Sequence, residues 1–484
     1  MSCRTPAEPL VVELDPVPAV MTAVRAVRDW PDVILFDSAL IHPRWGRYSF
    51  LTADPARQVR LATAVWGCDP FAELRRLSSE AAWERREDLP PFQGGWAGVM
   101  GYELGSCWER VPAARHDEFQ LPVLSAGWYD WVLAWDHLAG RAWLIAQPGS
   151  DHDPRQRVAA VMERLADPCA PRLGKLTPCG PTAPIGPTAP STPGGSAPLP
   201  LSALSPQWKV PQVDLLWSNF SADAYLRALE RVIEYIRAGD IFQANLTQRL
   251  LTPARTDPLT LYERLRTRNP APMAGLYLAR DWALLSASPE RFVQIVGQTV
   301  STRPIKGTRR RAAQPDADLF VKDALRESAK DQAENVMIVD LLRNDLSRVC
   351  RPGTVRVPQL CGVETFATVQ HLVSEICGDL QPGRTAWDVF RATLPGGSIT
   401  GAPKVRAMEI IAELEPTVRG PYTGSLFYVG ADGRTDSNLL IRTFVQRHGW
   451  LQCGVGGGVT AQSVPADEYE ETWHKAAGML RALE

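Results

Sequence analysis

Paired cysteines are missing from this sequence. Its nine cysteines are scattered along the chain, and none stands in a Cys-x-x-Cys pair. That distribution argues against a disulfide framework and against a zinc site. It is typical of reduced, mostly buried thiols in a cytosolic protein.

Long apolar runs and an excess of either charge are missing as well. No uninterrupted apolar stretch reaches the roughly 18 residues of a membrane-spanning helix, and residues 1–15 carry acidic side chains without the apolar run of a signal peptide. The 52 Lys and Arg residues nearly balance the 54 Asp and Glu residues, which gives a net charge of −2. We therefore expect no nucleic-acid and no membrane partner, and a small-molecule partner in the cytoplasm.

Proline is unevenly distributed along the 484 residues. The overall composition, with 45% hydrophobic and 22% charged residues, is that of a globular protein long enough for about three domains. Residues 168–211, however, hold 12 prolines in 44 positions with almost no charged or aromatic residue. Such a segment cannot bury a core. We expect a Pro-rich linker at 168–211 between an amino-terminal region, 1–167, and a carboxy-terminal region, 212–484.

Helical and strand patterns alternate irregularly in the carboxy-terminal region. An amphipathic helix is predicted to begin after Ser221, a residue suited to the N-cap, and to end at Gly239. The other predicted elements are a strand at 241–250, pairs of strands around 276–288 and 293–302, further strands across 424–460, and helices at 328–345 and from 465 onward. Strands in hairpins with interspersed helices predict an α+β fold with mainly antiparallel pairing.

Two pairs of acidic residues stand three positions apart near the starts of predicted helices. Asp331 and Glu334 form one pair, and Glu468 and Glu471 form the other. This spacing places each pair on one helical face, where two carboxylates repel each other unless a positive group lies between them. A set of four oxygen donors suits Mg²⁺ better than zinc. The alternative stays open that acids simply favour the first helical turn, where the helix dipole stabilises them.

One lysine stands in an apolar turn. Lys306 lies between Ile305 and Gly307, directly after a predicted strand. Burial would lower its pKa and make the amine a nucleophile near neutral pH. The other interpretation is an exposed lysine in a surface turn.

Three glycine-rich segments are candidates for ligand binding through exposed backbone amides. Residues 92–102 lack the Walker spacing and are better explained by close packing within a sheet. Residues 395–404 lead into a predicted helix, where amides bind carboxylates or phosphates, although a simple tight turn explains them equally well. Residues 454–458 lack the dinucleotide-binding order but offer amides to a small anion. His371 lies in an apolar run, which is more often the setting of a core histidine.

Together these segments resemble the family of chorismate-utilising enzymes, and within it the branch of aminodeoxychorismate synthase component I. The resemblance covers nearly the whole carboxy-terminal region and, more weakly, the amino-terminal region. It implies an α+β fold with a large, mainly antiparallel β-sheet sandwich flanked by helices. The motifs that follow the family's order and spacing are RPIKGT (303–308), AENVMIVDLLRND (333–345), HLVS (371–374), PGGSITGAPK (395–404), IRT (441–443) and EYEET (468–472).

The resemblance also implies a magnesium site and a chorismate site. Glu334 and Glu471 correspond to direct Mg²⁺ ligands, and Asp331 and Glu468 correspond to residues that hold metal-bound waters. Gly307, Thr308 and Ser398 correspond to residues that line the ring, and His371 to one beside the enolpyruvyl group. Arg442 and the amides of Gly456 and Gly458 match positions that bind the enolpyruvyl carboxylate, Lys475 matches a ring-carboxylate contact, and Tyr422 stands where relatives carry an aromatic residue.

Three positions distinguish the branches of that family. Relatives that form isochorismate or salicylate carry a water-activating lysine where this sequence has Gln243, which makes ammonia the better nucleophile here. Anthranilate synthases carry alanine at the position of Lys306, whereas the aminodeoxychorismate branch has a lysine that adds to the ring before ammonia attacks C4. Glu290 matches the general acid that protonates the departing 4-hydroxyl. These positions imply formation of 4-amino-4-deoxychorismate for para-aminobenzoate and folate synthesis.

Two alternatives stay open beside that function. One is anthranilate synthase component I, which Lys306 opposes. The other is a non-catalytic tryptophan-binding regulator, because relatives hold tryptophan in the amino-terminal half, near positions matching Asp37, Ser38 and 269–273. The intact acid pairs and Arg442 oppose a loss of activity. Because no triad-bearing glutaminase segment is present, the resemblance implies that ammonia comes from a separate glutamine amidotransferase subunit.

Overall fold

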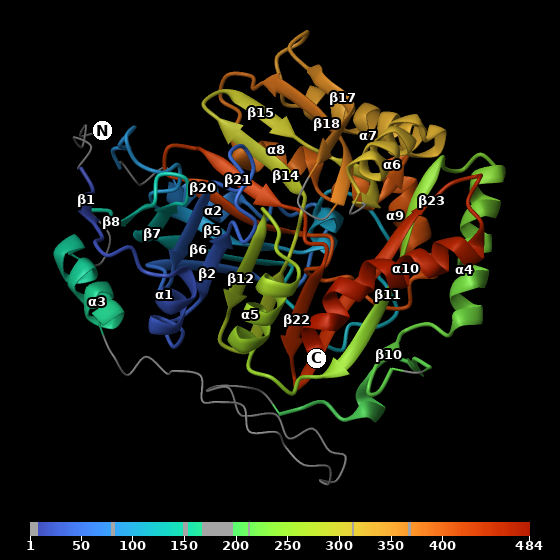
Figure 1. Ribbon diagram of the computed structural model, residues 1–484, viewed down its shortest axis with the longest axis horizontal. Coiled ribbons are helices and arrows are strands. Elements are labelled where there is room, and N and C mark those ends of the chain that lie inside the picture. Colours follow the sequence, from blue (N-terminus) through green and yellow to red (C-terminus); the bar gives the residue numbers. More distant parts are fainter. Residues whose placement is uncertain are drawn as a thin grey trace.

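The protein is built from two large β-sheets that lie face to face, with helices on the outer faces (Figure 1). The computed structural model describes residues 8–78, 83–148, 153–166, 197–211, 213–311, 314–365 and 369–484. Within these residues, all pairings between the named strands are antiparallel. The predicted α+β sandwich is therefore confirmed.

The first sheet has 13 strands and contains the 11-residue strand β11. Its strands in spatial order are β1 (Leu10–Glu13), β8 (Arg141–Ala146), β7 (Trp131–Asp136), β3 (Tyr48–Thr52), β2 (Val33–Asp37), β12 (Ala274–Leu278), β13 (Trp282–Ser286), β22 (Thr443–Arg447), β23 (Trp450–Val459), β11 (Gln243–Pro253), β10 (Trp217–Ser218) and β9 (Trp208–Lys209), with β19 (Gly401–Ala402) paired to β11.

The second sheet has ten strands. Its order is β16 (Ile305–Arg310), β18 (Val369–Asp379), β15 (Thr299–Thr302), β14 (Arg291–Val296), β21 (Thr435–Asn438), β20 (Ser425–Gly430), β5 (Gly95–Met100), β6 (Leu124–Tyr129) and β4 (Arg57–Leu61), with β17 (Arg356–Thr365) paired to β18. The glycine-rich segment at 92–102 contributes β5. A Cβ on Gly98 would lie 2.0 Å from the Ser125 carbonyl oxygen, so close packing explains this glycine.

The two regions on either side of the Pro-rich stretch share both sheets. In the first sheet, β2 pairs with β12, and in the second, β5 pairs with β20. The apolar core between the sheets draws on both regions: the ring centroids of Phe92 and Tyr428 are 4.6 Å apart, and those of Phe50 and Phe92 are 5.8 Å apart. Residues 1–167 and 212–484 thus fold together rather than as two separate sandwiches.

Part of the Pro-rich stretch is joined to this body. Most of it lies outside the described residues, but 197–211 contains β9 and the buried residue Leu204. The indole nitrogen of Trp450 donates to the carbonyl of Leu199 at 2.8 Å, and the Arg249 guanidinium donates to the Ser205 hydroxyl at 2.8 Å. The apolar residues near the end of this stretch therefore serve as an anchor on β11 and β23.

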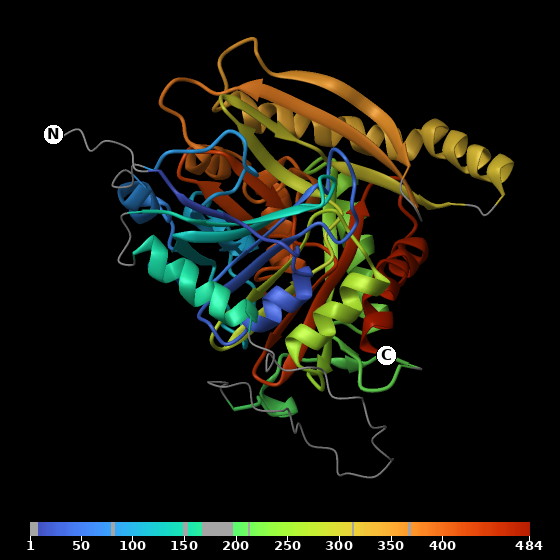
Figure 2. The same ribbon diagram turned by 60° about the vertical axis from the view of Figure 1, so that its left-hand side comes forward.

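Helices cover the outer faces of both sheets (Figure 2). The described helices are α1 (Val20–Ala26), α2 (Ala72–Ser78), α3 (Pro154–Ala166), α4 (Ala222–Arg237), α5 (Pro258–Arg268), α6 (Pro315–Glu327), α7 (Ala329–Ser347), α8 (Ala386–Thr393), α9 (Lys404–Leu414) and α10 (Pro465–Leu480). Helix α7 lies against β18 of the second sheet, and α10 lies against β23 of the first. These two helices carry the predicted acid pairs to the same end of the sandwich.

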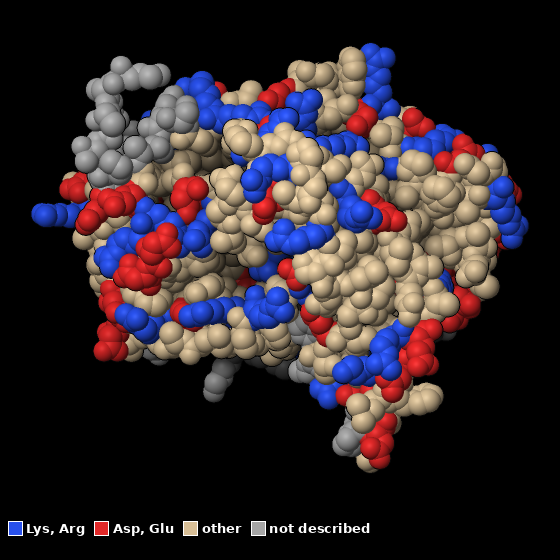
Figure 3. Space-filling view, turned by 90° about the horizontal axis from the view of Figure 1, so that it is seen from above, with Lys and Arg blue, Asp and Glu red and all other residues tan. Residues whose placement is uncertain are grey.

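Two predicted helix starts are confirmed at their caps. The Ser221 hydroxyl accepts a hydrogen bond from the Ala224 amide at the start of α4, and the Ser328 hydroxyl accepts one from the Asp331 amide at the start of α7. The molecular surface seen in Figure 3 mixes acidic and basic side chains, as the balanced composition predicts. Within the described residues, no helix combines the length and the apolar character needed to cross a membrane.

Candidate active site

Strand β11 carries a row of polar side chains into the space between the two sheets. Its residue Leu251 belongs to the apolar core between the sheets, whereas Ala244 and Leu246 on its opposite face pack under α4. The side chains on the inward face from Leu251 toward the strand start are Arg249, Thr247, Asn245 and Gln243, and all four are buried. The core therefore changes from apolar to polar along one strand, and the polar end lies beside the predicted site residues.

Glycines on β23 keep the space beside this polar row free. Gly458 and Gly456 stand directly opposite Asn245 and Thr247 in the register. A Cβ on Gly458 would lie 2.2 Å from the side-chain nitrogen of Gln243 and 3.5 Å from Nζ of Lys306. On the other face, a Cβ on Gly457 would lie 3.2 Å from Nζ of Lys475. The glycine run thus lets polar groups approach the backbone of β23 from both faces.

Lys306 lies on β16 and is half-buried, so it is not the exposed turn lysine of the alternative interpretation. The strand is irregular at Gly307, whose φ is +74°, and Nζ of Lys306 donates to the Ser398 carbonyl at 3.4 Å. Burial lowers the pKa of Lys306; the carboxylate of Glu334 opposes this shift, and the ammonium of Lys475 adds to it. The amine is therefore more easily deprotonated than that of an ordinary lysine.

Glu290, between β13 and β14, is the acidic counterpart of Lys306. The Ser398 hydroxyl donates to its carboxylate at 3.0 Å. Burial raises the pKa of Glu290 to about 7, against the opposing effects of the Ser398 hydrogen bond and the charges of Lys306 and Arg442. Ser398 thus contacts both groups, with its carbonyl near the lysine and its hydroxyl on the carboxylate.

Arg442 and His371 complete this side of the site. Burial lowers the pKa of the Arg442 guanidinium, and the nearby carboxylate of Glu290 opposes that shift. His371 is buried on β18, and burial together with the charge of Arg442 lowers its pKa to about 3. His371 is therefore neutral at physiological pH. Thr308 pairs with it in the register of β16 and β18, but the Thr308 side chain lies outside what the structure describes.

The predicted metal ligands approach from α7 and α10, each beside a cation. The ion pairs are Asp331 with Arg309 at 2.9 Å, Glu468 with Lys330 at 3.0 Å, and Glu471 with Lys475 at 2.7 Å. Burial raises the pKa of Glu334; the charge of Lys306 opposes the shift, while Glu468 and Asp331 add to it. Among the described residues, no three His, Cys, Asp or Glu side chains are gathered closely enough to hold a metal ion.

Tyr422 packs against β23 at Gly454, nearer the start of the strand than Gly456 and Gly458. Its ring covers Gly454, where a Cβ would lie 2.2 Å from the ring. It lines a small cavity of about 20 Å³, large enough for one water-sized molecule, together with Thr247, Glu415, Arg419 and Thr443. The geometry thus brings Tyr422 to the inward face of the first sheet, next to the row of polar residues on β11.

The sequence matches the chorismate binding enzyme family over residues 38–481. The chain belongs to this family. Its sequence is 41% identical over 450 residues to anthranilate synthase component 1 of Thermus thermophilus, and the match covers 91% of this chain and 90% of that protein. It is also 37% identical over 464 residues to aminodeoxychorismate synthase component 1 of Salmonella typhimurium, covering 93% of each.

A solved structure agrees with the assignment. The crystal structure of anthranilate synthase component I from Streptococcus pneumoniae superposes with a TM-score of 0.72 at 28% identity, covering 91% of this chain and 93% of that chain. The protein is therefore a chorismate-utilising enzyme of the anthranilate and aminodeoxychorismate synthase component I family.

The segments expected near a tryptophan pocket do lie side by side in this chorismate-binding enzyme. Asp37 stands opposite Ala274 in the register of β2 and β12, and the Leu40 amide donates to the Ala271 carbonyl. The carboxylate of Asp37 already accepts hydrogen bonds from the Tyr262 hydroxyl at 2.9 Å and from Arg266 at 2.6 Å. Tryptophan binding stays a prediction.

Several residues of the chorismate-binding enzyme's site were not singled out from the sequence. Asn245 donates from its side chain to the Ser398 carbonyl at 3.0 Å, and Lys404 donates to Asp345 at 2.6 Å, which ties α9 to α7. Asn245 stands two positions from Gln243 on a predicted strand, so the period of two was the available signal. Lys404 and Asp345 each lie within a recognised motif, but their contact joins residues far apart in the sequence.

Proposed function

We propose that this enzyme converts chorismate and ammonia to 4-amino-4-deoxychorismate, the reaction of aminodeoxychorismate synthase component I, on the route to para-aminobenzoate and folate. The observation that carries the proposal is the arrangement of Lys306 and Glu290 around Ser398. The pKa of the lysine is lowered and that of the carboxyl is raised to about 7. Burial therefore makes the neutral, nucleophilic amine of Lys306 easier to form than that of an ordinary lysine, beside a carboxyl that can donate a proton near neutral pH.

Lys306 acts first in the proposed mechanism. Its neutral amine forms a C–N bond to the chorismate ring, the double bonds of the ring shift, and the C4–O bond breaks. Glu290 gives its proton to the departing 4-hydroxyl, which leaves as water. Both protein groups end this step with changed protonation, and the ring is held covalently on Nζ of Lys306.

Ammonia acts second. Its attack at C4 forms the new C–N bond, the double bonds shift back, and the bond to Lys306 breaks, so the lysine is regenerated. Gln243 lies opposite Lys306 across Gly458, and neither polar atom of its buried amide has a hydrogen-bond partner within the described residues. An amide cannot remove a proton from water as a lysine does, which disfavours hydrolysis at this position.

The substrate carboxylates are expected to lie at the cationic and amide-rich parts of the site. Arg442 and the amides of Gly456 and Gly458 are assigned to the enolpyruvyl carboxylate, and Lys475 to the ring carboxylate. Gly307, Thr308 and Ser398 are placed along the ring, with neutral His371 and Tyr422 on the enolpyruvyl side.

Mg²⁺ is proposed as the cofactor. The donor set suits it, because Asp331, Glu334, Glu468 and Glu471 supply only oxygen atoms from two neighbouring helices, and mutual repulsion contributes to the raised pKa of Glu334. Glu334 and Glu471 would hold the ion directly, while Asp331 and Glu468 would hold its waters. When bound, the ion neutralises carboxylate charge on the substrate and so favours loss of the 4-hydroxyl.

Ammonia is proposed to come from a separate glutamine amidotransferase subunit. Relatives at 37% to 41% identity are named component 1, which is consistent with a second component. Free ammonium is expected to support turnover by the chain alone, and glutamine only after the partner is added. Glutamine-dependent turnover by the pure chain would contradict this part of the proposal.

Anthranilate formation is the second candidate function. The 41% identity to anthranilate synthase component 1 of Thermus thermophilus favours it. It requires ammonia to attack C2 directly, without a lysine nucleophile. Lys306 stands against it, because its half-buried amine reaches the Ser398 carbonyl in the same pocket as Glu290.

One incubation separates the two candidates. Purified protein, chorismate, ammonium and Mg²⁺ are combined, and the products are separated by chromatography at several times. We expect 4-amino-4-deoxychorismate as the main product. Anthranilate as the main product would replace the proposal by the second candidate, and no chorismate consumption in the presence of Mg²⁺ would reject both.

A further inference from the structure

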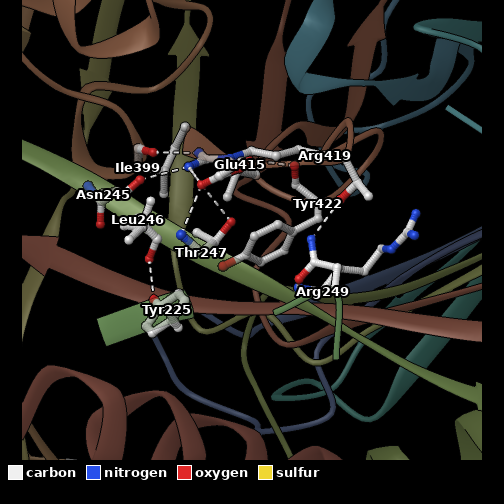
Figure 4. Close-up of polar contacts among 12 residues, drawn as sticks. Tyr225, Asn245, Leu246, Thr247, Arg249, Ile399, Glu415, Arg419 and Tyr422 are labelled. Carbon is white, nitrogen blue, oxygen red and sulfur yellow. Dashed lines mark hydrogen bonds and ion pairs between the residues drawn. The ribbon is translucent and has the colours of Figure 1, made fainter. Parts of the chain in front are cut away.

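A buried ion pair lies beside the proposed active site and takes no part in the mechanism described above. It joins Glu415, just after α9, to Arg419, and the two side chains are only 4% and 2% exposed. Arg419 donates from Nε to one carboxylate oxygen at 2.9 Å and from Nη2 to the other at 2.6 Å (Figure 4). Two parallel hydrogen bonds fix the guanidinium plane as well as its position.

The guanidinium also holds two backbone segments that belong to the site. Nη1 donates to the Ile399 carbonyl at 2.9 Å, and Nη2 donates to the Asn245 carbonyl at 2.8 Å (Figure 4). The carboxylate of Glu415 in turn accepts from the amide and the hydroxyl of Thr247, both at 2.9 Å. The pair thus ties the turn at 397–399 to the polar face of β11.

These contacts continue to the carboxyl of Glu290. Ile399 follows Ser398, whose hydroxyl donates to Glu290 at 3.0 Å, and the side chain of Asn245 donates to the Ser398 carbonyl at 3.0 Å. Arg419 therefore hydrogen-bonds to Ile399, the residue after Ser398, and also to Asn245, whose side chain donates to the Ser398 carbonyl. Release of either contact frees Ser398 to move relative to Glu290.

We propose that Glu415 and Arg419 form a positioning pair that sets the distance between Ser398 and Glu290 and thereby tunes the proton donor of the reaction. The inference rests on the proposed role of Glu290 as a general acid. Buried ion pairs add little net stability over a well-packed apolar pair, so a role in geometry accounts for this one better than a role in stability alone. The Tyr102 ring, 4.6 Å from the guanidinium, covers its remaining face.

Arg419→Lys tests the pair because it keeps the charge for Glu415 but removes the planar fork that spans two carbonyls. The Ser398 hydrogen bond lowers the pKa of Glu290, so its loss lets that pKa rise. We expect the alkaline limb of the pH–rate profile to move up by about half a pH unit or more. We also expect kcat to fall roughly tenfold, because the acid is no longer held in place.

Three further variants and a control define the result. Ser398→Ala is expected to move the limb in the same direction, and combining it with Arg419→Lys is expected to add no further shift, since both changes act on one hydrogen bond. Asn245→Ala leaves the ion pair intact but removes the hydrogen bond to the Ser398 carbonyl, and it is expected to move the limb too. Glu415→Gln breaks the pair from its other side and is expected to move the limb in the same direction, which decides the matter if Arg419→Lys does not fold. Arg157→Lys alters a similarly buried pair with Asp130 on the far side of the fold and is expected to lower the melting temperature only.

Rates are followed as chorismate consumption, so the shift is measured whatever the product. An unmoved limb in Arg419→Lys and Asn245→Ala, or full additivity of the Arg419→Lys and Ser398→Ala shifts, would overturn the positioning role. A product other than 4-amino-4-deoxychorismate, with the limb shifted as expected, would instead contradict the proposed function and leave the positioning role standing.

Discussion

Two side chains with opposite pKa shifts define the chemistry at the scale of residues. Lys306 and Glu290 are both removed from water, and burial disfavours the charged form of each. The same physical effect therefore favours a neutral amine on Lys306 and a protonated carboxyl on Glu290. The sequence supplied the identities of both residues, but not Ser398 as the group that touches each of them.

The first prediction concerns pH. Because the pKa of Glu290 is raised to about 7, the carboxyl is protonated below that pH and loses its proton above it. As a proton donor it is active in the protonated form, so kcat is expected to fall as pH rises through about 7. Glu290→Gln is expected to remove this limb and to lower kcat by about 100-fold or more. Stopped assays of chorismate consumption, run across a range of pH, test this prediction. If the fall of kcat at alkaline pH persists in Glu290→Gln, the ionisation belongs to another group.

At the scale of elements, local pattern was a sound guide wherever a segment's own sequence decides its structure. Ser221 caps α4 as expected, and the helix predicted at 328–345 begins at a cap formed by Ser328, since capping depends on neighbouring residues alone. Residues 128–133 show where such local patterns fail, because the chain passes at Asp130 from β6 in one sheet to β7 in the other. Every residue on either side is buried, so no polar–apolar alternation marked the crossing.

The second prediction concerns the acid pairs on α7 and α10. Glu334→Gln and Glu471→Gln are each expected to lower Mg²⁺-dependent turnover by about 100-fold or more, because each removes a proposed direct ligand of the ion. Melting temperatures are expected to stay near the parent's, since both side chains lie at the partly open site. Titration calorimetry with Mg²⁺ in the presence of chorismate provides a second measure of the loss.

Asp340→Asn is the matched control for these variants. Asp340 is an exposed acid farther along α7 and pairs with Arg343 on the same helix. Its replacement is expected to leave turnover and Mg²⁺ binding unchanged. Full activity of both glutamine variants in chelator-treated buffer would refute the metal assignment.

At the scale of the whole molecule, the site exists because distant segments share two sheets. Lys306 comes from the second sheet, the glycines at 454–458 from the first, and the acids from a helix on each. The motif resemblance predicted a set of site residues from these remote segments. It did not predict the mixing of regions 1–167 and 212–484 in both sheets, because the pairing of remote strands leaves no local signal in either strand.

The third prediction concerns the Pro-rich stretch. Deleting residues 177–194 is expected to leave ammonia-dependent activity near the parent's, because a Pro- and Gly-rich composition is not suited to apolar packing and the shorter connection changes the loop-closure free energy by only about 1 kcal/mol. Extending the deletion through 205 removes the contacts of Leu199, Leu204 and Ser205 with the fold. That longer deletion is expected to cost about 2 kcal/mol or more in the free energy of unfolding. Denaturant melts compare the two, and equal stability would show that 197–205 is no anchor.

Lys306 is proposed as the nucleophile that directs ammonia to C4, and the product formed by Lys306→Ala tests that role most directly. Wild type and variant are incubated with chorismate, ammonium and Mg²⁺, and the products are quantified by chromatography. The variant is expected to bind chorismate nearly as well as wild type but to form 4-amino-4-deoxychorismate about 100-fold more slowly or worse, with any residual amination at C2. If Lys306→Ala keeps the wild-type rate and product, the covalent mechanism is wrong and the lysine serves only to hold a carboxylate.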